Sequence, residues 1–343
     1  MNLRRRSLIV AAPALLGAPA WVCANVPEKS RLVVSVDGKD RLYYLPLKLA
    51  EQLGYFKSEG LDLRIVDYSG GAHALRALRV GDADGVACAF EHVIRQQLHG
   101  QPLRAVALMG RAPQIVLGIS PKRMPKFATP ADLKGRRIGV TAPGSSSHLM
   151  VKLVLAQAGV APEEVRIVGI GDGVGAIAAM RTGQIDAIAN IDPVISRLQR
   201  SIGLHIVVDT RVVADADRLY GGPMPAACLA LPQAFINHHP LTVQAGVNAI
   251  VRANQWIQAA AVPEIMAKIP RGHLPGDRAA YVDAIRAAKG ALSPDGIFPD
   301  DAAATALRAV VGSDAAFAGA NVDLTATFSN EFALVASAKT PRG

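Results

Sequence analysis

The sequence has few of the residue patterns that carry enzyme chemistry. It has no G-x-S-x-G segment, no phosphate-binding loop and no paired-cysteine motif, so it offers no nucleophile and no redox pair. Its eight histidines show no metal-ligand spacing, because His238 and His239 are adjacent rather than four residues apart. We therefore expect no cofactor, no metal and no enzymatic activity.

The sequence also lacks the patterns that would indicate nucleic-acid binding or a membrane-spanning helix. No run of lysine and arginine is interleaved with aromatic residues, which make up only 5% of the chain, so nucleic-acid binding has no local support. Beyond the first residues, no apolar stretch reaches the roughly 20 residues that a spanning helix needs. The low aromatic content favours a small polar ligand over a large ring-stacking site.

The first 24 residues have the layout of a cleavable export signal. Three arginines precede an apolar run from Leu8 to Val22, and cleavage is predicted after about Ala24, which implies a periplasmic protein. The segment RRSLI at residues 5–9 also resembles a twin-arginine signal, so the export route stays open. Cleavage removes three of 37 basic residues and none of 28 acidic ones, which leaves a net charge of +6 and favours anionic ligands only weakly.

Two cysteines, Cys88 and Cys228, remain after this cleavage. They could form a disulfide in an oxidising compartment, or each could be buried and unpaired within its apolar run. The sequence leaves both possibilities open.

The chain repeats itself at an offset of 102 residues. The segment Asp62–Arg95 aligns without gaps with Glu164–Arg197, and the identities keep the same order of elements. Each copy predicts a strand, a Gly-containing turn, a short helix, a second strand and a second helix. The predicted strands and first helices are Leu61–Asp67, residues 72–80 and Gly85–Ala89 in the first copy, and Val165–Ile170, Val174–Thr182 and Ile185–Ile191 in the second.

A further strand and helix precede each copy. Leu32–Val36 leads to a helix at about residues 44–53, and Arg137–Thr141 leads to one at about residues 145–158. Strands alternating with short helices predict parallel β-α-β units. We therefore predict an α/β protein of two related lobes, each a mostly parallel sheet flanked by helices. A helical tail is expected at residues 241–260, 278–289, 302–311 and 325–336.

Two such lobes predict a shared cleft. Ligands of open α/β sheets bind beyond the carboxyl ends of the strands, so lobes that face each other through those ends enclose one crevice. The loops expected to line it are residues 37–44, 68–71, 88–91 and 109–114 in the first lobe, and residues 141–148, 170–173 and 190–193 in the second.

The sharpest candidate site in these loops joins an apolar strand to a helix. Gly144 lets the backbone approach a ligand, and Ser145, Ser146 and Ser147 supply hydroxyls beside the positive end of the helix dipole. His148 stands one residue further in. Such a site suits a sulfonate or carboxylate, whereas the alternative is that the serines only cap the helix. The duplicated lobes favour the ligand site.

Five more residues are candidates at the edge of the cleft. Phe90 and Glu91 align in the repeat with Asp192 and the proline after it, although an aspartate there more commonly caps a helix. Tyr43 and Tyr44 follow the first strand and could contact a ligand or simply pack.

Five segments together have a family pattern, and they are spread from residue 31 to about residue 335. They are AEQLGYFKSEGL at 50–61, ADLKGRRIGV at 131–140, GSSSH at 144–148, GQIDA at 183–187 and SPDG at 293–296. With them the chain resembles the periplasmic substrate-binding proteins of ABC transporters for sulfonates, nitrate and taurine. That family also includes binders of thiamine-precursor pyrimidines.

The resemblance implies a two-lobed periplasmic-binding-protein fold with two crossing strands, near Gln114–Ser120 and Met224–Leu231. Residues 25–115 and 232–343 would form the first lobe, with the tail packed back on it, and residues 116–231 the second. It also implies a monomer that captures a small anion, such as a sulfonate, nitrate, taurine or a carboxylate, and delivers it to an ABC permease in the inner membrane. The Ser-rich helix start would be the oxyanion contact.

Two alternatives remain on the same scaffold. One is an enzyme acting on a pyrimidine or an aromatic acid, although the cysteine-rich segment of the related pyrimidine-precursor synthases is missing. The other is a sensory module that docks to a receptor instead of a permease.

Overall fold

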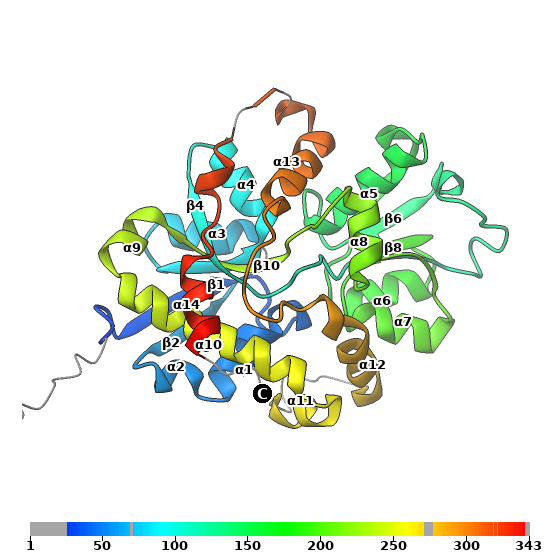
Figure 1. Ribbon diagram of the computed structural model, residues 1–343. Helices are drawn as coiled ribbons and strands as arrows, with labels where there is room; N and C mark the ends of the chain where they lie inside the picture. Colours follow the sequence, from blue (N-terminus) through cyan, green and yellow to red (C-terminus); the bar gives the residue numbers. More distant parts are fainter. Residues whose placement is uncertain (1–25, 69–70, 271–276, 318, 321, 340–343) are drawn as a thin grey trace, which may run out of the picture.

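The computed structural model describes residues 26–339 except 69–70, 271–276, 318 and 321. The predicted export signal lies outside the described residues. The chain forms two five-stranded sheets, which stand side by side with helices around each (Figure 1). The first sheet has the order β2-β1-β3-β10-β4 and the second β7-β6-β8-β5-β9. The strands are β1 (Arg31–Val36), β2 (Asp62–Asp67), β3 (Gly85–Ala89), β4 (Leu103–Leu108), β5 (Val116–Ile119), β6 (Arg137–Val140), β7 (Arg166–Gly169), β8 (Ala187–Asn190), β9 (His205–Asp209) and β10 (Ala227–Pro232).

The two sheets have one topology, which confirms the predicted fold class. In the first sheet, β1 pairs in parallel with β2 and β3, and β10 runs antiparallel between β3 and β4. In the second, β6 pairs in parallel with β7 and β8, and β5 runs antiparallel between β8 and β9. The antiparallel strand of each sheet is a crossing strand, because β5 follows the chain of the first sheet and β10 follows that of the second. We call the two sheets with their helices the first and second lobes.

The helices of the repeat occupy equivalent places in the two lobes. In both, the middle strand (β3 or β8) is fully buried, because helices cover both of its faces. The first lobe has the 3₁₀ turn η1 (Leu42–Tyr44), α1 (Leu45–Gln52), α2 (Tyr55–Ser58), α3 (Gly71–Arg79) and α4 (Phe90–Leu98). The second lobe has α5 (Ser146–Gln157), α6 (Val174–Arg181), α7 (Val194–Ile202) and α8 (Val213–Tyr220).

The tail is helical as expected, except near its end. Its helices are α9 (Gln233–His238), α10 (Pro240–Ala259), α11 (Val262–Lys268), α12 (Arg278–Ala288), α13 (Ala302–Ser313) and α14 (Glu331–Lys339). The last one was predicted to begin at about residue 325 but begins at 331. Asp323 caps a separate 3₁₀ turn there by accepting from Thr325 N, and the Asn330 side chain is bonded to the backbone of Phe298 in both directions. These bonds hold the segment out of the helix.

The tail packs against both lobes rather than only the first. Helix α10 lies on α1 and α2, but α12 contacts α7 and α13 lies between α4 and α5. Arg200 of α7 pairs with Asp277 and Asp283, at 3.3 and 2.9 Å, and Lys152 Nζ of α5 donates to the Ser313 carbonyl at 2.8 Å. The tail therefore links the lobes at a distance from the crossing strands.

Two further findings concern cysteines and membranes. Cys88 and Cys228 face each other in register across β3 and β10, and both are free and buried. Among the described residues, no helix combines the length and the apolar character needed to cross a bilayer.

Candidate functional site

A cavity of about 650 Å³ lies between the two lobes at the carboxyl ends of the parallel strands. Its walls come from the loops that follow β1, β2 and β3 in the first lobe and β6, β7 and β8 in the second. This is the position at which the topology predicts a ligand site. Its lining includes Asp37, Arg41, Tyr43, Tyr44, Thr141, Gly144, Ser145, Ser146, Ser147 and Asp172.

The Ser-rich segment has the geometry of a helix cap on one wall of this cavity. Ser145 is the N-cap of α5, and its Oγ accepts from His148 N at 3.4 Å and from Thr141 Oγ1 at 2.9 Å. Ser147 Oγ accepts from Thr141 N at 3.0 Å. Gly144 has φ +82°, a conformation that favours glycine, and starts the turn into the helix. One hydroxyl, that of Ser145, is thus engaged in capping, and that of Ser147 is bonded to the backbone of Thr141 at the start of the same loop.

Part of the predicted anion site nevertheless remains available. The N–H groups of Ser146 and Ser147 meet no acceptor among the described residues. Amides of a helix's first turn that have no acceptor attract negative charge. His148 does not line the cavity, because its Nδ1 accepts from Gly144 N at 2.9 Å. Burial, and then the nearby charges of Lys152 and Arg95, lower the pKa of His148, which favours the neutral imidazole.

Two contacts join the lobes: the Arg41–Asp172 pair lies between two lining residues of the cavity, whereas the Ser146–Glu91 bond joins a lining residue to one that is not part of the lining. Ser146 Oγ donates to Glu91 Oε1 at the start of α4, and Glu91 is only 3% exposed. Arg41 binds Asp37 of its own lobe at 2.8 Å and Asp172 of the second lobe. The two lobes are therefore held in a closed arrangement.

The backbone around Arg41 and Asp172 positions this bridge. Asp67 at the end of β2 accepts from the N–H groups of Gly38 and Lys39, which fixes the loop after β1. A Cβ on Gly38 would lie 2.7 Å from Arg41 Nε, so the side chain crosses this glycine closely. Burial lowers the pKa of Arg41, but Asp37 and Asp172 raise it by more, so the guanidinium stays charged.

Negative charge exceeds positive charge around the cavity. The carboxylates of Asp37 and Asp172 line it together with Arg41, which is the one Lys or Arg among the described lining residues. An anion held about 4 Å from a carboxylate is repelled by about 4 kcal/mol at an effective dielectric constant of about 20. A helix N-terminus attracts it by about 0.3–1 kcal/mol, or about 2 kcal/mol when partly buried. Beside a carboxylate of the lining, the repulsion is the larger effect.

The tyrosines predicted for the site reach it. Tyr43 and Tyr44 line the cavity with rings 5.1 Å apart in an edge-to-face arrangement, and Tyr44 OH donates to Asp37 Oδ1 at 2.5 Å. Burial, followed by nearby carboxylates, raises the pKa of both phenols well above the ordinary value. Both remain neutral donors.

Phe90 and Asp192 lie elsewhere, which corrects their assignment to the cleft edge. Phe90 is in the core, where its ring packs 5.3 Å from that of Phe298. Asp192 is buried behind the cavity and accepts from Ser196 N and from Arg211 Nη1, both at 2.9 Å. Because Ser196 lies in the first turn of α7, this bond caps the helix. Asp192 does so although it lies one residue before the N-cap position, which is Pro193.

Sequence reasoning named the correct loops but missed their charged residues. Asp37 and Arg41 lie in the predicted loop 37–44, and Asp172 lies in loop 170–173. Ionisable side chains in loops at strand ends are the signal that would have found them.

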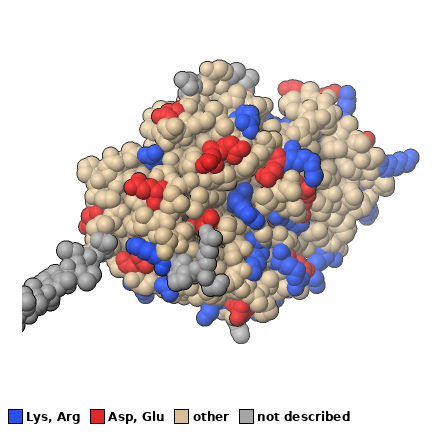
Figure 2. Space-filling model, in the orientation of Figure 1, with Lys and Arg blue, Asp and Glu red and all other residues tan. Residues whose placement is uncertain are grey.

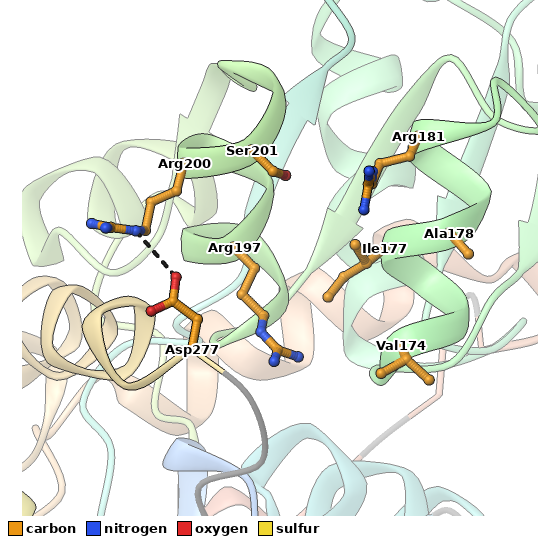
Figure 3. A pocket seen from close by; sticks show the side chains of 8 residues that line it. All are labelled: Val174, Ile177, Ala178, Arg181, Arg197, Arg200, Ser201 and Asp277. Carbon is orange, nitrogen blue, oxygen red and sulfur yellow. Dashed lines mark ion pairs between the residues drawn. The ribbon is translucent and has the colours of Figure 1, made fainter.

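A second, more open pocket lies on the flank of the second lobe. It has a volume of about 840 Å³ and is walled by α6, α7 and the start of α12. Figure 3 shows Ile177 and Arg181 of α6 facing Arg197 of α7, with Arg200 paired to Asp277. Lys and Arg side chains also gather over this corner of the molecule (Figure 2). The pocket lies away from the strand ends, so we take the cavity between the lobes as the candidate site.

Comparison with known proteins agrees with the resemblance noted in the sequence. A family model described as NMT1/THI5 like matches residues 42–264. The nitrate/nitrite binding protein NrtA of Nostoc sp. is 23% identical over 281 residues, which are 75% of this chain and 61% of that protein. The 4-amino-5-hydroxymethyl-2-methylpyrimidine phosphate synthase of Legionella pneumophila is 22% identical over 144 residues, which are 42% of this chain and 44% of that one. The chain thus spans about half the length of these relatives.

A solved structure from Bordetella bronchiseptica RB50 is more similar. It is 49% identical, has a TM-score of 0.85, and the match covers 91% of this chain and 98% of that one. The two-lobed arrangement is therefore shared over nearly the whole described chain.

Proposed function

The chain belongs to the NMT1/THI5-like family, and from this premise we propose that it is the solute-binding component of an ABC importer. One observation carries the proposal: a single cavity at the strand ends is closed by contacts from both lobes, through Ser146 with Glu91 and Arg41 with Asp172. Such a cavity encloses a small molecule and has a shape that depends on whether the molecule is there.

The place of action follows from the same proposal. The predicted export signal puts the mature protein in the periplasm, where it binds solute as a monomer and docks to an inner-membrane permease. The relative NrtA, named as a binding protein, supports a transport role. The solute binds one lobe of an open form, and the second lobe then closes over it.

An anionic solute is the first candidate, as the sequence led us to expect. Nitrate, a sulfonate, taurine or a small carboxylate would accept from the N–H groups of Ser146 and Ser147. The nitrate and nitrite bound by the Nostoc relative support this class.

A solute bearing N–H donors is the second candidate, favoured by a specific observation. The carboxylates of Asp37 and Asp172 outnumber the one guanidinium among the described lining residues. Acceptor groups in excess select a ligand that brings donors or positive charge.

We also propose that the chain binds its solute without altering it. The hydroxyls of Ser145 and Ser147 are bonded within the cap, and the Nδ1 of His148 is engaged by a backbone N–H. The Legionella relative is named as a synthase, so turnover is the outcome to test. Incubation with a bound solute, followed by mass spectrometry, should return the solute unchanged.

The decisive experiment identifies what the protein carries. We expect a mass spectrum of the purified, denatured protein to reveal a released small molecule. Titration of that molecule into stripped protein should give one site by calorimetry and a smaller radius of gyration by X-ray scattering. Binding without any compaction would contradict closure of two lobes, and the absence of any bound or binding small molecule would contradict the proposal itself.

A further inference from the structure

We propose that the pocket between α6, α7 and the start of α12 is a second binding site, which takes a small anion with two or more acidic groups, and that its occupation weakens the closure of the lobes. This pocket and this ligand differ from the cavity between the lobes and its solute. The binding of the anion is independent of the proposed function, whereas its effect on solute affinity rests on that function.

The charge of this pocket is opposite to that of the cavity between the lobes. Its described lining residues include three arginines, Arg181, Arg197 and Arg200, and one carboxylate, that of Asp277. The described lining of the cavity has two carboxylates and one arginine. An excess of guanidinium groups attracts anions, and each guanidinium can hold a carboxylate or a phosphate through two parallel hydrogen bonds. The pocket therefore suits an anion better than the cavity does.

The arginines reach the pocket from two helices. Figure 3 shows Arg181 of α6 and Arg197 of α7 on opposite sides of it. Arg181 makes no ion pair and no side-chain hydrogen bond within the part of the chain that the structure describes. The volume of about 840 Å³ admits a small organic anion. A ligand with two acidic groups can bind both helices at once, which a monovalent anion cannot do.

The pocket lies at a seam between the lobes. Helix α12 belongs to an apolar cluster of the first lobe, in which Tyr281 and Ile285 pack with Leu45 of α1. Helices α6 and α7 belong to an apolar cluster of the second lobe, which contains Met180 and Leu198. A rotation of one lobe against the other therefore moves α12 relative to α6 and α7 and changes the shape of the pocket.

One arginine of the pocket spans this seam. Arg200 of α7 pairs with Asp277 at 3.3 Å and with Asp283 of α12 at 2.9 Å. Ion pairs between side chains as exposed as these are weak, so a multivalent anion can compete for the guanidinium. Asp277 also repels the anion in the closed arrangement. The pocket consequently binds the anion more tightly when α12 has moved away from α7.

This difference in affinity couples the pocket to the cavity. A ligand that binds the open form more tightly shifts the lobes towards that form. The anion should therefore lower the affinity for the solute, and the solute should lower the affinity for the anion. Because coupling between two binding sites is reciprocal, the two factors must be equal.

The first experiment measures the anion alone. Citrate and pyrophosphate are titrated into stripped protein by calorimetry, with sodium chloride at the same ionic strength as the reference. We expect one site with a dissociation constant of about 1 mM or lower for at least one of the two anions. Arg181→Gln should weaken this binding about threefold or more, because it removes one of the guanidinium groups that hold the anion.

The repeat supplies a matched control for this experiment. Arg79 aligns with Arg181 at the offset of 102 residues, is exposed at the end of α3 and does not line the pocket. Arg79→Gln makes the same change in net charge, so it should bind the anion as the wild type does. The absence of anion binding by the wild type, or an equal loss in Arg79→Gln and Arg181→Gln, would overturn the proposal.

The second experiment measures the coupling. The affinity for the solute that the purified protein releases is determined with and without a saturating concentration of the bound anion, at constant ionic strength. We expect the anion to lower this affinity about threefold, and saturating solute to lower the affinity for the anion by the same factor. A solute affinity that does not change would overturn the effect on closure.

A second variant tests the competition for Arg200. Asp277→Asn keeps a side-chain oxygen that can accept from Ala279 N and cap α12, but it removes a charge that pairs with Arg200. It should bind the anion at least as tightly as the wild type, because a repelling carboxylate is gone. The anion should then lower its solute affinity less than that of the wild type. Weaker anion binding by Asp277→Asn would contradict the competition.

Failure of this inference can be distinguished from failure of the proposed function. A protein that releases and binds a solute but binds neither anion would retain the importer function and lose the second site. A protein that binds an anion, with the expected loss in Arg181→Gln, but neither releases nor binds a solute would retain the second site. That result would overturn the importer function and, with it, the coupling.

Discussion

The two lobes share one topology but contribute different chemistry to the cavity. The first lobe brings Asp37 and Arg41, whereas the second brings the hydroxyls and amides at the start of α5 together with one carboxylate, Asp172. The acidic residues at the starts of α4 and α7 differ most. Glu91 accepts a hydrogen bond from Ser146 of the other lobe, while Asp192 turns back into its own lobe and pairs with Arg211.

This difference shows that equivalent helix starts in a duplicated scaffold need not keep equivalent roles. The duplication preserves what the sheets require, namely strand order, buried middle strands and glycines at helix ends. The residues just beyond the strand ends carry no such constraint, so each lobe can use them for stability or for binding.

The largest effect should come from Asp192. Asp192→Ala removes one partner of Arg211, whose side chain is only 5% exposed, so it should lower the free energy of unfolding by about 3 kcal/mol. Glu91→Ala, at the matching helix start, should cost about 1 kcal/mol, since its partner is a serine hydroxyl. Urea denaturation of both variants measures the contrast. Equal losses in the free energy of unfolding would mean that Asp192 is not the one of the two residues that mainly stabilises the fold.

Asp215→Ala provides the control for this contrast. Asp215 pairs with Arg218 on the exposed face of α8, and such surface pairs contribute about 0–1 kcal/mol. A loss near that of Asp192→Ala would show that burial is not the cause.

The second effect concerns the bridge between the lobes. Asp172→Asn removes the second lobe's charge from Arg41, so the closed form should lose stability relative to the open form. We expect the affinity for the bound solute to fall about tenfold, which corresponds to about 1.4 kcal/mol, while the urea midpoint stays within error. Calorimetry and X-ray scattering measure this, and an unchanged affinity would mean that the ion pair does not contribute to closure.

Much of the fold could be predicted because it depends on short-range pattern. The bounds of β3 agree with the prediction to the residue, and α10 and α12 agree within one residue at each end. The repeat supplied the equivalence of the two sheets, and most of loop 141–148 lines the cavity between the lobes. In each case the pattern that supports the prediction lies within a single segment of the sequence.

The rest depends on contacts between distant segments, which periodicity does not encode. Arg41 and Asp172 are 131 residues apart, and nothing local indicates that they pair. Phe90 and Asp192 were placed at the cleft edge by alignment, but Phe90 fills a core position and Asp192 meets Arg211. The packing of α12 and α13 on the second lobe was missed for the same reason.

A third effect is a difference between the lobes in how their stability depends on pH. Asp186 and its counterpart Asp84 both accept from a backbone N–H of the neighbouring strand. Asp84 also pairs with one lysine, Lys29, at 2.5 Å, whereas Asp186 is bonded to two arginines, Arg137 and Arg123. Burial alone would raise the pKa of Asp186, yet the hydrogen bonds from Arg137 and Arg123 lower it to about 2. Because the pKa of Asp186 is lower in the folded state, its ionised carboxylate stabilises the fold at pH values above about 3.9, the pKa of an unfolded aspartate. This stabilisation is lost as the pH falls through about 2.

Asp186→Asn should therefore cost about 1–2 kcal/mol at pH 7, after allowance for solvent screening of the exposed Arg123. The difference from the wild type should shrink as the pH falls below 4. Urea denaturation between pH 7 and pH 2 measures it. A difference that stays constant with pH would mean that the loss arises from packing rather than from charge.

The smallest effect decides between the two roles that the sequence left open for the serines. Helix α4 begins after Ala89 with no side-chain cap, whereas α5 is capped by Ser145. Ser145→Ala removes this cap, so that neither helix start has a side-chain cap. Because the cap bond is long at 3.4 Å, the substitution should cost only about 0.5–1 kcal/mol of stability. If Ser145 is only a cap, affinity for the solute should change less than threefold in calorimetry. A larger loss would place the hydroxyl in contact with the solute, because the weak cap alone cannot account for it.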